Sequence, residues 1–342
     1  MISLALTSLA HGDGHGRRAY SPKEHGALHA ANVRSRDYAY RFDGKEHVGF
    51  VAYPTSPAAG PRPGALIGHQ WTGVQEMERS RAEELAARGF VVLVPDVYGK
   101  GKRPAAGEAA KAAMQAAQSN VPRLHRMLAH AVATLKQLGE GPAVNSSAIV
   151  ANGYCFGGQL VLEMARANTA GLLAVSSFHG SLASLTTARA PMRAVVRVHH
   201  ASLDAQGDAG LQRLEAELQT AQASGWATLK YGGVEHGWTD PANRVYAAAQ
   251  AAQAHESMLA LYEQMGLATP DPQSAARPAD AGSWGAALLL GLLIGGLIAA
   301  VGLAAREQRN KQVVHDIALA SMEEEIDDEE EFPSSPRSSS RK

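Results

Sequence analysis

The sequence predicts an α/β fold, in which a mostly parallel β-sheet is covered by helices on both faces. From Tyr38 onward, short apolar runs alternate with segments whose apolar residues recur at helical spacing. Several runs, such as residues 90–95, are apolar throughout, which is typical of strands buried on both faces of a sheet. A Gly-rich string at 153–158 separates one such run from a helical segment. Strands that alternate with helices in this way build parallel sheets.

The expected strands share β-branched or apolar residues and end at turn signals. They lie at residues 37–42, 48–53, 65–69, 90–95, 148–152, 172–177, 194–199 and 227–231. The first two are expected to form a hairpin, because the Asp43-Gly44 dipeptide between them favours a tight turn.

The expected helices each have a polar face and an apolar face. They lie just after the third strand and at residues 108–138, 159–167 and 243–265. The first is expected to expose Glu76, Arg79, Glu83 and Glu84 to solvent. The Ala-rich second stretch is expected to break near Pro122, because proline has no N–H group to donate within a helix.

The chain divides into regions of different composition. Residues 1–30 form a leader, 31–267 the α/β domain, 268–283 a Pro-, Ala- and Asp-rich linker, 284–305 a transmembrane helix and 306–342 an acidic, then Ser-rich tail. The transmembrane helix is predicted because its 22 residues are uncharged and apolar. A helix of that length extends over roughly 33 Å, enough to cross the hydrocarbon core of a bilayer.

The charges that flank the transmembrane helix predict its orientation. Arg306, Arg309 and Lys311 follow it, whereas acidic residues outnumber basic ones before it. Basic flanks favour the cytosol, so we expect a single-pass membrane protein with a cytosolic tail and a lumenal or extracellular domain. A signal peptide at 1–10, which ends in small residues, agrees with this orientation. The alternative is a disordered leader, with the helix as a C-terminal anchor and the domain in the cytosol.

The composition also limits the classes of partner and cofactor that we expect the chain to bind. A formal net charge of −1 provides no electrostatic basis for binding nucleic acid. Gly291 and Gly295 have the small-xxx-small spacing of paired transmembrane helices, so a homodimer is one hypothesis. The leader is His-rich, but its spacing matches no metal site, and no metal or cofactor is expected. The single cysteine, Cys155, excludes an intrachain disulfide.

The string Gly153-Tyr-Cys155-Phe-Gly157-Gly158 carries the predicted chemistry. It has the form Gly-x-nucleophile-x-Gly and stands between an expected strand and an expected helix, as that motif requires. Side chains at Gly153 or Gly157 would collide with neighbouring backbone in such a sharp turn. The helix dipole favours a thiolate at Cys155, and the N–H of Phe156 can donate to an oxyanion. Without this context, a lone cysteine is usually a small buried apolar residue.

A nucleophile of this kind needs a base and a group that orients the base. In this motif both follow the nucleophile along the chain, each after a strand. Asp204 follows one expected strand, with Asp208 as the alternative, and His236 lies in a Gly-flanked loop after the next. Catalytic groups gather at the carboxyl ends of parallel strands, so Cys155, Asp204 and His236 are expected to meet there.

Five strings resemble the dienelactone hydrolase family, over about residues 38–267. They are His69-Gln-Trp-Thr-Gly-Val74, Val94-Pro-Asp-Val-Tyr-Gly-Lys100, Gly153-Tyr-Cys-Phe-Gly-Gly158, Ser177-Phe-His-Gly-Ser181 and Glu235-His-Gly-Trp238. The third is the most specific, because most α/β-hydrolases have serine at its centre. The resemblance implies an α/β-hydrolase fold and a triad of Cys155, Asp204 and His236. It also implies that the backbone N–H of Trp71 is the second oxyanion donor.

The chain departs from the family pattern at positions that bear on the substrate. The resemblance implies a glutamate that helps to activate the thiol, but Gln70 stands there and cannot accept a proton. It also implies two arginines that hold a substrate carboxylate. Lys100 matches one and can hold a carboxylate as a point charge, whereas Asp240 replaces the other and would repel it. Gln70 and Lys100 are the candidate substrate-binding residues, and dienelactone itself is not the expected substrate.

The predicted function is hydrolysis of a small ester, lactone or thioester through an acyl-thioester on Cys155. His236 acts as the base, and the N–H groups of Phe156 and Trp71 form the oxyanion hole. Two alternatives keep the fold. In the first, the domain is an inactive ectodomain of a membrane protein that only binds a ligand. In the second, Cys155 is a redox sensor.

Overall fold

The computed structural model describes residues 32–268. The predicted leader (1–30), transmembrane helix (284–305) and tail (306–342) lie outside this range, as does all of the linker (268–283) except its first residue. Within the described range, none of the helices combines the length and the apolar character that crossing a bilayer requires. The described range covers nearly all of the α/β domain expected at 31–267.

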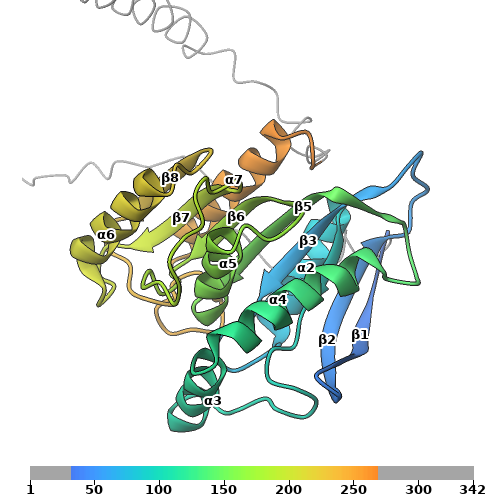
Figure 1. Ribbon diagram of the computed structural model, residues 1–342, viewed down its shortest axis with the longest axis horizontal. Helices are drawn as coiled ribbons and strands as arrows, with labels where there is room; N and C mark the ends of the chain where they lie inside the picture. Colours follow the sequence, from blue (N-terminus) through green and yellow to red (C-terminus); the bar gives the residue numbers. More distant parts are fainter. Residues whose placement is uncertain (1–31, 269–342) are drawn as a thin grey trace, which may run out of the picture. The chain divides into compact units, whose positions relative to one another are not determined.

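An eight-stranded β-sheet forms the centre of the described part of the chain (Figure 1). The strands are β1 (Val33–Phe42), β2 (Lys45–Pro54), β3 (Arg62–Gly68), β4 (Val91–Val94), β5 (Val144–Tyr154), β6 (Leu172–Phe178), β7 (Val195–Ala201) and β8 (Trp226–Tyr231). Their order in the sheet is β1-β2-β4-β3-β5-β6-β7-β8. The β1–β2 and β2–β4 pairs are antiparallel, and every other pair is parallel. The predicted, mostly parallel sheet is confirmed.

Helices cover both faces of the sheet, as predicted (Figure 1). They are α2 (Glu76–Ala87), α3 (Glu108–Gln118), α4 (Val121–Lys136), α5 (Phe156–Arg166), α6 (Gly207–Thr220) and α7 (Ala248–Gln264). Buried side chains of α4, α5 and α6 form one core cluster with one face of the sheet, and those of α2 and α7 form a second cluster with the other face. Along β4, Val91 and Leu93 join the first cluster and Val92 and Val94 the second, because successive side chains of a strand point to opposite faces.

Several predicted boundaries need correction. No helix is predicted at 207–220, yet α6 forms there and buries Leu211, Leu214 and Leu218 at helical spacing. The Ala-rich stretch breaks as expected, because the Asn120 side chain accepts the N–H of Arg123 at 3.0 Å and so caps a new helix, α4. Helix α5 begins three residues earlier than predicted, immediately after Cys155.

The solvent-exposed face predicted for α2 is right for Glu76 and wrong for Glu84. The side chain of Glu84 is only 13% exposed, and it forms an ion pair with Arg81 at 2.8 Å. Glu78, in the first turn, is fully buried. Its carboxylate accepts the N–H of Gln75 at 2.9 Å, which closes the helix N-terminus, and the N–H of Gln70 at 3.0 Å. Glu78 thereby ties α2 to the loop that follows β3.

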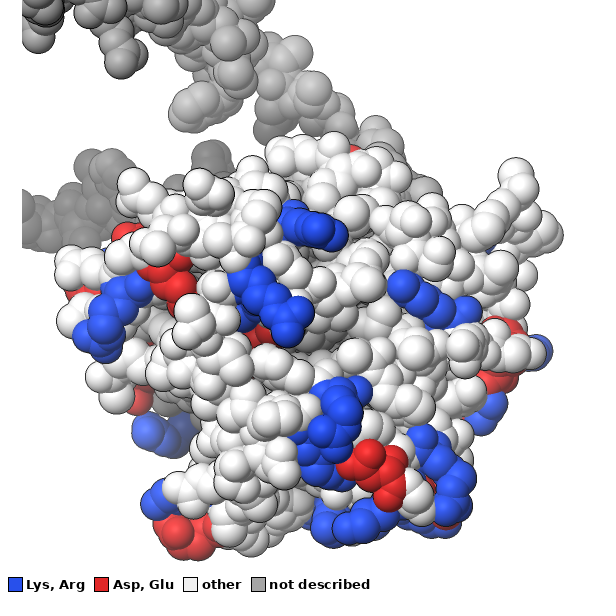
Figure 2. Space-filling view, viewed as in Figure 1, with Lys and Arg blue, Asp and Glu red and all other residues white. Residues whose placement is uncertain are grey.

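The surface over α4, α5 and α6 carries both signs of charge. Figure 2 shows the basic and acidic side chains of this face in small groups, with wide uncharged areas between them. Several are local ion pairs, for example Arg123 with Asp43 at 3.1 Å and Lys111 with Glu108 at 3.6 Å. This distribution agrees with the near-neutral total charge of the chain.

A buried ion network fixes α5, the helix that follows Cys155. Glu163 and Arg166 are almost completely buried. Arg166 lies 3.0 Å from Glu163 and 2.8 Å from both carboxylate oxygens of Glu217 on α6. Glu163 also lies 3.0 Å from His125 on α4. The network therefore joins three helices on one side of the sheet, and each buried charge has a partner of opposite charge or a hydrogen bond.

Arg166→Ala is expected to lower the free energy of unfolding by about 3–5 kcal/mol, because it leaves two carboxylates without their partner. Urea denaturation followed by circular dichroism measures this change. Lys100→Ala is the control, since the Lys100–Glu46 pair is exposed, and it should cost less than about 1 kcal/mol. Equal losses in the two variants would contradict a stabilising role for the buried network.

Candidate active site

The backbone bends sharply at Cys155, between β5 and α5. Its φ is 55° and its ψ is −116°, a strained conformation for a residue with a side chain. A Cβ atom at Gly157 would lie 2.0 Å from the carbonyl oxygen of Gly68, and one at Gly153 would lie 2.1 Å from that of Gly157. Both positions therefore require glycine, as predicted. The thiol is half-buried beyond the carboxyl end of β5.

Cys155, His236 and Asp204 form one hydrogen-bonded chain. The Nε2 atom of His236 lies 3.2 Å from the Sγ of Cys155, and its Nδ1 lies 2.8 Å from the Oδ2 of Asp204. Each residue follows the end of a parallel strand, β5, β7 or β8, so all three reach the same edge of the sheet. Asp208, the alternative acid, pairs with Lys230 at 2.9 Å instead. The structure thus brings together the three residues that the sequence singles out.

The electrostatics of these three hydrogen-bonded residues favour a charged imidazole beside a charged carboxylate. Burial raises the pKa of Asp204, but hydrogen bonds from His236 and from the backbone of Gln206 outweigh it and bring the pKa to about 2. Burial lowers the pKa of His236, but the contacts with Asp204 and Cys155 outweigh it and bring the pKa to about 10. An imidazolium beside a thiolate is the arrangement used by cysteine nucleophiles.

Gln206 holds Asp204 in place, although sequence reasoning does not identify it. Its backbone N–H donates to the Oδ1 of Asp204 at 3.0 Å. Its side-chain amide reaches the loop after β6, where Oε1 accepts the N–H of Leu182 at 2.6 Å and Nε2 donates to the carbonyl of Gly180 at 3.1 Å. The side chain of Asp204 is consequently only 3% exposed and oriented toward His236.

A second histidine, His179, supports the ring of His236. The two rings meet edge to face, with centroids 5.0 Å apart. The Nε2 of His179 forms a hydrogen bond with the Oγ1 of Thr239 at 2.7 Å. Burial lowers the pKa of His179 to about 3, so this ring stays neutral and adds no charge beside His236. His179 lies in one of the strings that resemble the family, but the sequence assigns it no role.

The two predicted oxyanion donors are Phe156, the first residue of α5, and Trp71, in the loop after β3. Among the described residues, no backbone carbonyl accepts the N–H of either residue. The hydroxyl of Tyr98 donates to the carbonyl of Trp71 at 2.9 Å, and its ring stacks on that of Phe156 with centroids 6.0 Å apart. Burial lowers the pKa of His69 to about 4, and its neutral Nε2 accepts the N–H of Val97 at 3.2 Å. These contacts fix the loop, while the oxyanion role stays a prediction.

The two predicted substrate-binding residues are placed differently. Gln70 precedes Trp71, and its Nε2 donates to the Oδ2 of Asp240 at 2.9 Å. The side chain of Lys100 is 60% exposed and donates to the Oε1 of Glu46 at 2.9 Å. Substrate binding by Lys100 would require this ion pair to open, and it stays a prediction.

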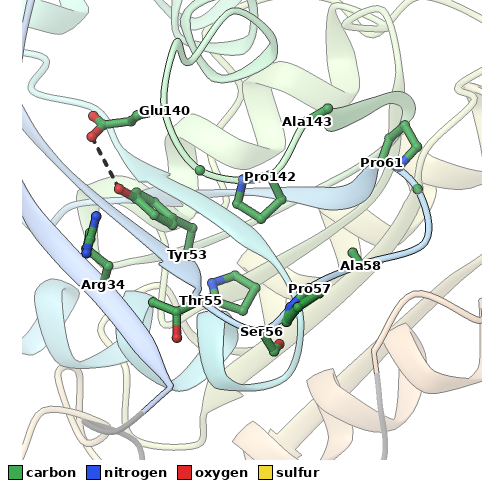
Figure 3. A pocket seen from close by; sticks show the side chains of 13 residues that line it. Arg34, Tyr53, Thr55, Ser56, Pro57, Ala58, Pro61, Glu140, Pro142 and Ala143 are labelled. Atoms are coloured by element: carbon green, nitrogen blue, oxygen red, sulfur yellow. Dashed lines mark hydrogen bonds between the residues drawn. The ribbon is translucent and has the colours of Figure 1, made fainter.

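A separate hollow of about 730 Å³ lies at the amino-terminal ends of β3 and β5, whereas Cys155 follows the carboxyl end of β5 (Figure 3). The loops before β3 and β5 line it, with Pro57, Pro61 and Pro142 in its wall. Glu140 also lines it and accepts a hydrogen bond from the hydroxyl of Tyr53 at 3.2 Å. Strand β3 runs from this end toward the thiol over roughly 20 Å, at about 3.3 Å per residue. The hollow is therefore remote from Cys155.

Within residues 32–268, no three His, Cys, Asp or Glu side chains are grouped so that they could hold a metal ion. The groups that meet at Cys155 are one thiol, one imidazole and one carboxylate. They are suited to nucleophilic attack and proton transfer.

Known proteins share this fold and this region of sequence. Residues 48–266 match the profile of the Dienelactone hydrolase family. An uncharacterised protein of Caenorhabditis elegans is 30% identical over 113 residues, which cover 32% of this chain and 70% of that protein. A dienelactone hydrolase-like promiscuous phosphotriesterase from metagenomic libraries has a TM-score of 0.63 and 25% identity, covering 70% of this chain and 100% of the other. Esterase 2 of Thermogutta terrifontis, phosphorylated by paraoxon, has a TM-score of 0.51 and 17% identity over 69% of this chain and 96% of its own, and shows the fold alone.

The imidazole of His236 is expected to titrate far above an ordinary histidine. Because its pKa is raised from 6.5 to about 10, its contacts stabilise the fold fully below pH 6.5, and this stabilisation is lost as the pH rises through 10. For Asp204, whose pKa is lowered from 3.8 to about 2, the stabilisation is present above pH 3.8 and is lost as the pH falls through 2.

Nuclear magnetic resonance of the labelled imidazole measures this pKa directly. Asp204→Asn should bring the pKa of His236 down toward 6.5, because the carboxylate partner is removed. A ring that titrates near 6.5 in the parent chain as well would contradict the contacts assigned to it.

Proposed function

The chain belongs to the dienelactone hydrolase family and is a carboxylic-ester hydrolase, and on that premise we propose that Cys155, His236 and Asp204 form its catalytic triad. The observation that carries this proposal is the continuous hydrogen-bonded chain from sulfur to imidazole to carboxylate, with contacts of 3.2 and 2.8 Å. The proposed substrate is a small ester, lactone or thioester.

The first step transfers the acyl group to sulfur. The thiolate of Cys155 attacks the carbonyl carbon and forms a C–S bond, and the carbonyl electrons move onto oxygen. When the tetrahedral intermediate collapses, the bond to the leaving group breaks, and His236 gives its proton to the departing oxygen or sulfur. An acyl-thioester and a neutral imidazole remain, with Asp204 still holding the Nδ1 of the ring.

The second step releases the acid. Water attacks the acyl-thioester while His236 accepts one of its protons, and the C–S bond then breaks. The acid leaves, and the thiolate is restored beside a protonated His236. The raised pKa of His236 supports this cycle, because the ring returns to its charged form at neutral pH. The amide of Gln70 donates to Asp240, so proton transfer rests on His236 alone in this proposal.

The N–H groups of Phe156 and Trp71 are the proposed oxyanion hole for both tetrahedral intermediates. Their support is that no backbone carbonyl of the described residues accepts either N–H, and that Tyr98 contacts both residues. Loss of one such donor typically costs about 3 kcal/mol of transition-state stabilisation.

Cys155→Ala is expected to lower kcat/KM for a fluorogenic ester by about 10³-fold or more, because the acyl group then has no acceptor. Asp204→Asn should also lose most of the activity, since His236 loses the group that orients it. Asp208→Asn is the matched control, because Asp208 pairs with Lys230 and should keep the activity of the parent chain. Mass spectrometry of acid-quenched enzyme should find the acyl group on Cys155.

The same measurements separate the two competing functions. Unchanged hydrolysis in Cys155→Ala would refute the triad. A chain that cleaves no ester, and whose Cys155 is not alkylated by iodoacetamide, would support a domain that only binds. Sensitivity of Cys155 to peroxide without turnover of esters would support a redox sensor.

The apolar segment at 284–305 is the proposed membrane anchor, with the catalytic domain in a lumen or outside the cell. Protease treatment of intact vesicles is expected to remove only the tail at 306–342 and to leave the catalytic domain protected. Digestion of the catalytic domain instead would place it in the cytosol. Cross-linking in the same vesicles tests whether Gly291 and Gly295 pair two copies.

A further inference from the structure

A hydrogen bond between Gln70 and Asp240 joins two loops at the candidate active site. We propose that this pair selects esters that carry an ammonium or hydroxyl group beyond the scissile bond and rejects esters that carry a carboxylate there. This inference rests on the proposed function, because it names the substrates of the same site.

The Gln70 end of the pair belongs to the loop that lies beside the thiol. Gln70 is two residues beyond Gly68, and the carbonyl oxygen of Gly68 closely approaches the backbone of Gly157 in the first turn of α5. The next residue after Gln70 is Trp71, the proposed oxyanion donor. Gln70 therefore follows the point where β3 meets α5, the helix that begins immediately after Cys155.

The Asp240 end belongs to the loop that carries His236. Thr239, the residue before Asp240, is hydrogen-bonded to His179 at 2.7 Å, and the ring of His179 lies edge to face on that of His236. The pair therefore connects the loop beside the thiol to the loop beside the imidazole. Gln70 and Asp240 are both half-buried.

The hydrogen bond fixes which atoms face outward. A carboxylate can only accept, so the amide of Gln70 must direct its nitrogen to Asp240, and its Oε1 is left as an acceptor. The second oxygen of Asp240, Oδ1, accepts the N–H of Ala242 at 2.9 Å and still has a free lone pair. The pair thus offers acceptors to a substrate and no donor beyond the second amide hydrogen of Gln70.

In the described part of the chain, the charge of Asp240 has no cation beside it. Among residues 32–268, no Lys, Arg or His nitrogen lies within 4.0 Å of its carboxylate. Arg244, four residues later, faces Glu235 at 3.8 Å instead. Glu78 is fully buried and accepts the N–H of Gln70 at 3.0 Å, but burial raises the pKa of its carboxyl group, so the negative charge of the pair comes from Asp240. A substrate near this pair meets acceptors and negative charge.

A substrate carboxylate would therefore be repelled, and an ammonium group would be attracted and could donate a hydrogen bond. A hydroxyl group could also donate a hydrogen bond, but it has no charge and would gain no electrostatic attraction. One unit of charge at about 6 Å, in the intermediate dielectric of a protein surface, changes binding by about tenfold or more. The selectivity should depend on salt, because the pair is only half-buried.

Two matched series of esters test the proposal on the parent chain. The first contains methyl esters of one linear acid whose far end carries an ammonium, a methyl or a carboxylate group. The second contains acetates of one linear alcohol with the same three end groups. Proton release measures kcat/KM for each without a thiol reagent. We expect the ammonium ester to react about tenfold faster than the methyl ester, and the carboxylate ester about tenfold slower, in at least one series.

Asp240→Asn keeps the shape of the side chain and removes its charge, so the three esters should then react within about threefold of one another. Asp37→Asn is the matched control, because it removes an exposed carboxylate on the edge strand β1. This variant should cleave the three esters in the same order of kcat/KM as the parent chain. A salt series on the parent chain supplies a test that needs no variant. The ratio between ammonium and carboxylate esters should shrink as salt rises.

Equal rates for all end groups in both series, or a faster carboxylate ester, would overturn the selectivity while leaving the hydrolase intact. A selectivity that persists in Asp240→Asn would also overturn it, because another group would then be its source. Failure to cleave even the neutral methyl-ended esters would remove the proposed function, and this inference with it.

Discussion

The site depends on one contact, the approach of the α5 backbone to the end of β3. The carbonyl oxygen of Gly68 lies where a side chain at Gly157 would begin, so α5 can rest on β3 only because neither residue has a Cβ atom. The same contact lies next to Cys155, whose φ of 55° places it at the sharp turn between β5 and α5. At the other end of α5, Glu163 pairs with His125 on α4 and Arg166 pairs with Glu217 on α6, and these buried contacts hold the helix to its neighbours. The position of the nucleophile is thus set by backbone contact at one end and by paired charges at the other.

Histidines near the thiol differ in charge although burial acts on all of them in the same direction. Burial lowers the pKa values of His69 and His179 to about 4 and about 3, and among the described residues neither ring is hydrogen-bonded to a carboxylate. The pKa of His236 is raised to about 10, because a carboxylate and a sulfur lie at its two nitrogens. Partners of opposite charge, rather than exposure, therefore decide which ring carries a proton. The neutral ring of His179 can lie against His236 without repelling it.

The elements and groups that could be predicted are those whose positions follow from local pattern and chain order. Cys155, Asp204 and His236 each follow a strand, so parallel topology alone brings them to one edge. Contacts such as Gln206 with Gly180, or Gln70 with Asp240, join loops that are far apart in sequence, and no spacing rule encodes them. The sequence analysis does not predict helix α6, although its leucines recur at helical spacing. The helical pattern predicts that Glu84 is exposed, because it does not reveal the ion pair of this side chain.

Strand β8 lies at the margin of the sheet, and this position determines how the domain loses activity on heating. Within the described residues β8 pairs only with β7, yet the loop after it carries His236. Cys155 instead follows β5, which has a neighbour on each side. Marginal strands open by local fluctuation at lower free energy than central ones. Mild heating would therefore separate the imidazole from the sulfur while most of the sheet is still intact, so inactivation would precede melting. A molecule in that state would still carry its sulfhydryl but would lack the proton acceptor that makes it useful.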